Sequence, residues 1–117
     1  MQIQHRIVGE VAIIDLNGRL ALGDGDELLR DKVKGLIQQG ENRLVLNLTD
    51  VPYMNSTGLS AIVGTYTTAR KRGGDLKLLH PAKRVKDLLI ISGLSTVLGV
   101  FDSEEDAVRS FPPSAGV

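Results

Sequence analysis

The chain has 117 residues, of which 42% are hydrophobic and 24% are charged, values that are ordinary for one globular domain. It contains no cysteine, which excludes disulfide bridges, thiolate metal sites and cysteine nucleophiles. Fourteen basic residues balance fourteen acidic ones and only 3% of residues are aromatic, so we expect no nucleic-acid binding.

The N-terminal segment predicts a β-hairpin. Two β-rich runs, residues 3–8 and 11–16, are separated by Gly9-Glu10, which is the spacing of a tight turn. Residues 11–14 are apolar throughout, which is typical of a strand covered on both faces. A glycine-rich connection over residues 18–25 follows, in which Asp24 or Asp26 could cap the next helix.

The middle of the chain predicts two helices around a central strand. The first helix ends near Gly40, the strand covers residues 44–48, and a loop over 49–55 leads into the second helix, which ends at Gly73-Gly74. Apolar residues recur at helical spacing in both helices. The predicted buried faces are Leu29, Val33, Leu36 and Ile37 in the first helix and Leu59, Ile62, Val63 and Tyr66 in the second.

The remaining sequence continues this alternation. We expect a strand at 76–79, a helix at 83–91 with Val85, Leu88 and Leu89 facing inward, a strand at 97–101, and a helix at 104–111 capped by Ser103. The connections after the hairpin are long enough for parallel pairing. The pattern therefore predicts an α/β fold with a mixed, mostly parallel sheet, an N-terminal antiparallel hairpin and four flanking helices.

Signatures of catalysis and of metal binding are missing. The sequence has no Walker loop, no dinucleotide fingerprint and no nucleophile elbow, so we expect no enzyme activity and no cofactor. His5 and His80 lack metal-ligand spacing, and His80 is expected to be a surface or packing histidine rather than a base. The acidic residues near the first helix favour its N-terminal dipole rather than a cation; they are Asp24, Asp26, Glu27 and Asp31. The basic run at 70–72 suits a helix C-terminus, and a phosphate-binding patch is the alternative.

One segment carries a candidate site. Ser56 and Thr57 place two hydroxyls where the exit loop of a parallel strand meets a helix N-terminus, the edge at which open α/β sheets bind ligands and partners. Phosphorylation of Ser56 would add roughly −1.5 to −2 charges, which could pair with the amides around Gly58. The structural alternative is that Asn55, Ser56 or Thr57 only caps the helix, and the two interpretations are compatible.

The segment 54–59, Met-Asn-Ser-Thr-Gly-Leu, resembles the Asp-Ser-Ser/Thr-Gly-Leu motif of STAS-domain anti-sigma factor antagonists. The resemblance extends over nearly the whole chain, through residues 13–20, 44–59, 72–78 and 92–94. It implies a single STAS domain over residues 1–111. The composition of the remaining residues, 112–117, predicts a flexible tail.

The resemblance also implies a function by partner switching. The unphosphorylated antagonist binds an anti-sigma factor, typically a serine kinase, and so releases the sigma factor; phosphorylation ends this binding and a protein phosphatase restores it. The phosphoacceptor carried over is Ser56, with Thr57 as the second choice. The implied partner-binding residues are Leu20, Ala21, Met54, Asn55, Ser56, Thr57 and Gly58.

Two positions depart from the family pattern, because Asn55 and Ala21 stand where many members of this family have Asp. They favour an alternative function, a STAS binding subunit of a lipid-transport or sensory assembly that is not phosphorylated. A third hypothesis, Ser56 as a nucleophile with His5 or His80 as its base, lacks an orienting group.

No apolar run approaches the roughly 20 residues of a membrane-spanning helix, and polar residues interrupt the N-terminus. We expect a cytoplasmic protein without direct membrane insertion. Its oligomeric state stays open, and residues 111–113 are a candidate contact with a neighbour.

Overall fold

The expected hairpin is formed by β1 (Gln2–Val8) and β2 (Val11–Asn17), which pair antiparallel from Gln2 opposite Asn17 to Val8 opposite Val11. Gly9 adopts a φ of 61° in the turn, a conformation that costs glycine little because it has no Cβ. This is a computed structural model, and it describes residues 1–112.

Three further strands extend the sheet in parallel, and four α-helices flank it. The strand order is β1-β2-β3-β4-β5. The added strands are β3 (Arg43–Asp50), β4 (Asp75–Leu79) and β5 (Gly99–Phe101), and the helices are α1 (Asp26–Gln38), α2 (Ser56–Lys71), α3 (Lys83–Ile91) and α4 (Glu104–Arg109). A short 3-10 turn, η1 (Leu94–Thr96), precedes β5. The predicted fold class is confirmed.

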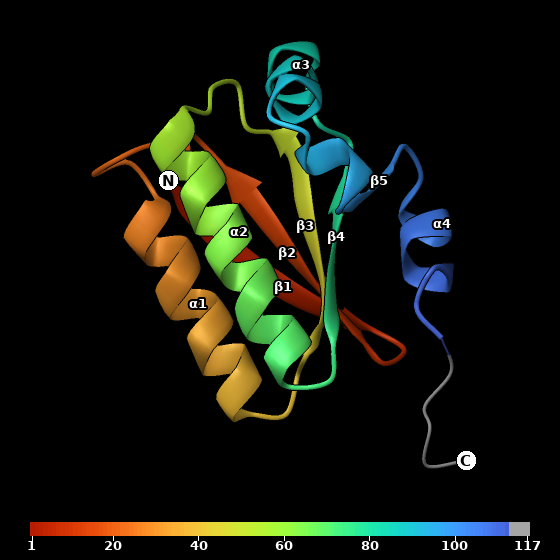
Figure 1. The fold of residues 1–117 in the computed structure, drawn as a ribbon. Helices are drawn as coiled ribbons and strands as arrows, with labels where there is room; N and C mark the ends of the chain where they lie inside the picture. Colours follow the sequence, from red (N-terminus) through yellow and green to blue (C-terminus); the bar gives the residue numbers. More distant parts are fainter. Residues whose placement is uncertain (113–117) are drawn as a thin grey trace.

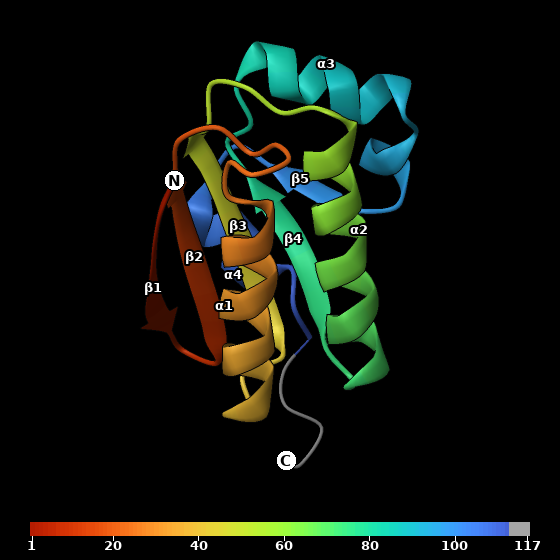
Figure 2. The ribbon, with the colours of Figure 1, turned by 90° about the vertical axis from the view of Figure 1, so that its left-hand side faces the viewer.

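Both faces of the sheet are covered, but unequally (Figure 1). Alternate residues of β2, such as Ala12 and Ile14, belong to the larger core under α1 and α2, whereas Val11 and Ile13 belong to a smaller cluster under α4. This two-sided burial explains the uninterrupted apolar run at the start of β2. α3 lies across one end of the sheet in both views (Figures 1 and 2) and adds Val85 and Leu89 to the larger core.

The buried face of α2 agrees only in part with the predicted one, since Leu59 and Tyr66 pack against the larger core from its margin. Ile62 is buried, but Val63 is 39% exposed, and Leu59 and Tyr66 are only half-buried. The helix instead buries small residues, which allow its backbone to approach the sheet closely. These small residues are Gly58, Ala61, Thr65 and Ala69.

The structure also differs from the sequence prediction at the ends of several helices. The N-cap of α1 is Gly25 with a φ of 94°, so the prediction of Asp24 or Asp26 as cap is wrong, although the buried Asp26 carboxylate accepts a hydrogen bond from Gly23 N at 3.1 Å. Ser103 caps α4 as predicted, by accepting a hydrogen bond from Asp106 N. α4 ends at Arg109, before Phe111, whose ring is buried in the smaller cluster. Of the predicted flexible tail, residues 113–117 lie outside the described part of the chain.

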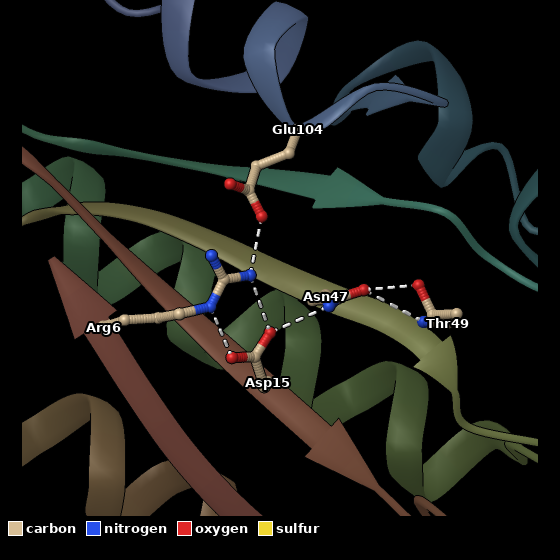
Figure 3. A network of polar contacts seen from close by, with 5 residues as sticks. All are labelled: Arg6, Asp15, Asn47, Thr49 and Glu104. Carbon is tan, nitrogen blue, oxygen red and sulfur yellow. Dashed lines mark hydrogen bonds and ion pairs between the residues drawn. The ribbon is translucent and has the colours of Figure 1, made fainter. Parts of the chain in front are cut away.

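A charged network connects the hairpin to α4 (Figure 3). Arg6 Nε donates to Asp15 at 2.8 Å, and Arg6 Nη2 donates to Asp15 at 3.1 Å and to Glu104 at 2.6 Å. Asn47 Nδ2 donates to the same aspartate at 2.8 Å, and the Asn47 carbonyl accepts from Thr49. These hydrogen bonds, first from Arg6 and then from Asn47, hold the pKa of the Asp15 carboxyl below its usual range.

Within residues 1–112, no helix combines the length and the apolar character that crossing a membrane requires.

Candidate functional site

The candidate site is built where two loops meet at the carboxyl end of the parallel strands. Residues 18–25, which follow β2, lie against residues 51–55, which follow β3. Gly18 N donates to Asp50 O at 3.1 Å, Leu20 N donates to Tyr53 O at 3.0 Å, and Leu20 forms a parallel bridge with Met54. The two loops therefore continue the β2–β3 pairing beyond the sheet and support the N-terminus of α2.

Asn55 is the N-cap of α2. Its Oδ1 accepts hydrogen bonds from the backbone N–H groups of Thr57 and Gly58, both at 3.1 Å. The capping interpretation is therefore confirmed for Asn55, and Ser56 and Thr57 are the first residues of the helix rather than its caps. The two amides that sequence reasoning offered to a phosphate on Ser56 already have this side chain as their acceptor.

The Ser56 hydroxyl is available. Ser56 is exposed, and within residues 1–112 no hydrogen bond engages its Oγ. Thr57, the neighbouring hydroxyl, is half-buried. The arrangement thus presents one free hydroxyl at the start of a helix, and no contact within the fold depends on this hydroxyl.

Gly58 is the point of closest approach between the helix and the first loop. A Cβ placed on it would lie 2.1 Å from the Leu20 carbonyl oxygen and 2.8 Å from Met54 Cγ. Any side chain here would force α2 away from the first loop, because real Cβ atoms do not come this close to a backbone oxygen. Glycine at this position is therefore explained by the packing of the site.

The other predicted partner-binding residues divide into two groups. Leu20, Ala21 and Met54 are buried, at 0%, 4% and 6% exposure, so their side chains support the loops from below. Asn55 and Thr57 are half-buried, and Ser56 is exposed. Contact of any of these residues with a partner stays a prediction.

Sequence reasoning missed the exposed apolar side chains around the site. Leu22 in the first loop is 75% exposed, Leu28 in the first turn of α1 is 53% exposed, and Tyr53 is 39% exposed. The Arg19 guanidinium lies 4.9 Å from the centre of the Tyr53 ring and 4.0 Å from the Asp24 carboxylate. The available signal was a leucine directly before the Gly-Asp-Gly run at residues 23–25, since no helical or strand face requires a leucine there.

The histidines do not complete a catalytic site with Ser56. His80 is exposed and its backbone, at a φ of 52°, donates to Phe101 O, while His5 lies on β1. Neither forms a side-chain hydrogen bond with Ser56 in the described part of the chain. No group of three or more His, Asp or Glu residues within 1–112 is arranged to hold a metal ion.

Comparison with known proteins identifies relatives over almost the full length. A family model for the STAS domain matches residues 2–107. The anti-sigma-B factor antagonist of Bacillus subtilis (strain 168) is 35% identical over 107 residues, which cover 92% of this chain and 88% of the relative.

Two solved structures share the fold closely. A Thermotoga maritima protein, described as a candidate anti-sigma factor antagonist, superposes with a TM-score of 0.86 at 25% identity, covering 92% of both chains. The Bacillus cell fate determinant SpoIIAA in its phosphorylated form gives a TM-score of 0.72 at 25% identity, covering 93% of this chain and 98% of that one.

Proposed function

The chain belongs to the STAS domain family, and we propose that it acts as an anti-sigma factor antagonist controlled at Ser56. In its unphosphorylated form it binds an anti-sigma factor, a serine kinase, and thereby frees a sigma factor in the cytoplasm. Phosphorylation of Ser56 ends this binding, and a phosphatase restores it. The chain itself performs no catalysis, because the kinase supplies the chemistry.

The observation that carries this proposal is the free hydroxyl of Ser56. A kinase must reach its acceptor without unfolding the substrate, and Ser56 is exposed with an Oγ that has no hydrogen-bond partner within residues 1–112. Phosphorylation in a structural relative, SpoIIAA, supports the same chemistry. Thr57 is a weaker candidate because it is half-buried.

The capped helix explains how a phosphate would act against binding. Asn55 Oδ1 already accepts hydrogen bonds from the Thr57 and Gly58 amides. Fewer free N–H groups at the helix N-terminus are therefore left to stabilise a doubly charged phosphate on Ser56. The phosphate would face the partner, where its desolvation inside an interface is unfavourable. The switch would therefore weaken the complex rather than change the fold of this chain.

The apolar residues around Ser56 supply the surface that such a partner would cover. Leu22, Leu28 and Tyr53 are exposed on the two loops and α1. Ile90 and Ile91, at the end of α3, are 54% and 82% exposed, and α3 lies across the same end of the sheet (Figures 1 and 2). Exposed apolar side chains gathered at one end of a domain are typical of a protein-binding surface.

The proposal is tested by measuring the affinity for the anti-sigma factor encoded in the same genome. Ser56→Ala should bind like the wild type, and Ser56→Asp should bind at least about tenfold more weakly, a difference of about 1.4 kcal/mol. Thr68→Asp is the matched control, because it adds the same charge to an exposed position about 18 Å along α2. Equal binding by Ser56→Asp and Thr68→Asp would contradict control at Ser56.

A second candidate, a STAS binding subunit that is not phosphorylated, is favoured by Asn55 and Ala21, which remove carboxylates from the edge of the site. Intact mass and peptide mapping of the protein from its native host separate the two functions. One phosphoryl group on the peptide that contains Ser56 supports the switch. An unmodified pool under both growth and stress, together with co-purification of a transport or sensory subunit, supports the second candidate.

A further inference from the structure

The outer edge of β1 is an unpaired sheet edge. β1 is the first strand in the sheet order and pairs only with β2. No element within residues 1–112 is paired to its other side, and Figure 2 shows β1 along the open margin of the sheet. The edge spans seven residues, Gln2–Val8, whereas the opposite edge strand, β5, has three.

The hairpin turn determines which backbone groups face outward. A two-residue turn joins Val8 to Val11, so Val8 and every second residue before it exchange hydrogen bonds with β2. The N–H and C=O groups of the intervening residues point away from β2. The outward-facing donors and acceptors therefore belong to Ile3, His5 and Ile7.

This edge lacks the features by which sheet edges avoid pairing. Between Gln2 and Val8 there is no proline, glycine, lysine, aspartate or glutamate, and the pairing with β2 has no bulge. The Arg6 charge is already paired with Asp15 and Glu104 on the face that carries α4. Ile7 is 50% exposed beside this free ladder.

The residues of the edge are arranged symmetrically about His5. Ile3 and Ile7 lie two positions on either side of it, and Gln4 and Arg6 lie one position on either side. A two-fold symmetric interface requires this kind of pattern, because each residue must meet its counterpart from the other chain.

We propose that β1 pairs antiparallel with β1 of a second copy of this chain, with His5 opposite His5. In this register Ile3 lies opposite Ile7 of the second copy, and Ile7 lies opposite Ile3. The outward-facing backbone N–H and C=O groups of Ile3, His5 and Ile7 therefore all form hydrogen bonds with the second copy. Gln4 lies opposite Arg6 on the other face, so the two Arg6 guanidinium groups do not face each other. Other registers leave at least one outward-facing residue unpaired.

The resulting sheet would have ten strands, five from each copy. Because the two β1 strands run in opposite directions, the two Ser56 sites would lie at opposite ends of this sheet. Each site would thus remain open to a partner, and the dimer does not depend on the function proposed for Ser56.

Sedimentation velocity over a concentration series tests the dimer. Wild type should shift from monomer to dimer as concentration rises, and His5→Pro and Ile7→Lys should lose the dimer. His5→Pro removes one outward donor and leaves the bonds to β2 intact. Ile91→Lys is the control, since it makes the same change at an exposed isoleucine outside the edge and should keep the dimer. A wild type that stays monomeric, or a dimer that persists in both β1 variants, would overturn the proposal.

Cysteine cross-linking tests the register, and the absence of native cysteine makes it unambiguous. The two cysteines introduced by His5→Cys, one in each copy, would have Cα atoms about 5.5 Å apart, within disulfide range. The two cysteines introduced by Ile7→Cys would be displaced by four positions, or about 14 Å, and should not cross-link. Oxidation should therefore convert only the His5→Cys protein to a covalent dimer. Equal cross-linking of both variants would overturn this register.

Discussion

At the scale of single residues, the local structure around Ser56 depends on two neighbouring residues, Gly58 and Asn55. Gly58 permits the close approach of α2 to the Leu20 carbonyl, and Asn55 holds the first amides of the helix. Ser56, between them, contributes no side-chain hydrogen bond within residues 1–112. The residue that carries the proposed function is thus separate from the residues that carry the local structure.

Alanine at Gly58 should destabilise the protein by at least about 3 kcal/mol, because its Cβ would lie 2.1 Å from a backbone oxygen. Gly64→Ala, in the middle of the same helix, is the matched control. Nothing lies within 4 Å of a Cβ added there, so the better helix propensity of alanine should stabilise by about 1 kcal/mol. Urea unfolding measures both free energies, and two equal shifts would contradict the packing at Gly58.

Asn55→Ala should cost about 1 kcal/mol through loss of the cap. Asn55→Asp should keep the cap and gain about 0.5 kcal/mol from a carboxylate at the positive end of the helix. Ser56→Ala should stay within about 0.5 kcal/mol of the wild type because its hydroxyl has no structural partner. Thermal unfolding of the three variants checks this order of stabilities, and a large loss in Ser56→Ala would show a hidden structural role.

At the scale of elements, α4 depends on its contacts with the rest of the fold. It has six residues, too few for a helix to persist by its own hydrogen bonds. Ala107 and Phe111 attach it to the smaller apolar cluster, and Glu104 attaches it to Arg6 on β1. The last helix is therefore held by apolar packing against several strands of the sheet and by one ion pair to the N-terminal hairpin.

The Arg6–Asp15 contact should make stability depend on pH. Since the pKa of Asp15 is lower in the folded state, the stabilisation is present above the ordinary aspartate value near 4 and is lost as pH falls through the folded value. Asp15→Asn should therefore flatten the fall in stability of the wild type between about pH 5 and pH 2. Asp31→Asn, at an exposed residue of α1, is the control and should show the same dependence of stability on pH as the wild type. If Asp15→Asn also lost stability with falling pH as the wild type does, the Arg6–Asp15 contact would not be the cause of the pH dependence.

The elements that sequence periodicity predicts well are those with large apolar side chains. β2, β3 and α3 bury the leucines, isoleucines and valines that the pattern indicates. The predicted face of α2 was right for Ile62 and wrong for the exposed Val63. The rest of its contact with the sheet depends on small residues that a hydrophobic pattern does not weight, namely Gly58, Ala61, Thr65 and Ala69. The α1 cap was also missed, since Gly25 acts through its positive φ rather than through a side-chain acceptor.

At the scale of the whole molecule, the chain is electrically balanced, with fourteen basic and fourteen acidic residues and a formal net charge of zero. One phosphoryl group adds roughly −1.5 to −2 charges, a large change relative to zero. Phosphorylation by the cognate kinase should therefore produce one acidic band in native isoelectric focusing. Ser56→Ala should show no such band, whereas Thr57→Ala should show it; the opposite result would move the acceptor to Thr57.

Sequence reasoning indicated where the candidate site lies in the fold but not which of its side chains are exposed. The motif at 54–59 indicates where a strand meets a helix, and the structure confirms that placement. Which side chains face outward depends on contacts between residues 18–25 and 51–55, which are remote in the sequence. Leu20 and Met54 are buried by this contact, while Leu22 and Tyr53 are exposed, and no periodicity within either loop distinguishes them.

The strand order β1-β2-β3-β4-β5 has a consequence for how the chain folds during its synthesis. Each strand pairs with the strand synthesised just before it, so none must wait for a later segment to be inserted between two earlier ones. Pairing each strand with its predecessor limits each parallel connection to one helix-containing crossover, a shorter loop than an order that skipped a neighbouring strand would have to close. The sheet can therefore grow strand by strand as the polypeptide leaves the ribosome, with the Ser56 loop assembled before α4 has been translated.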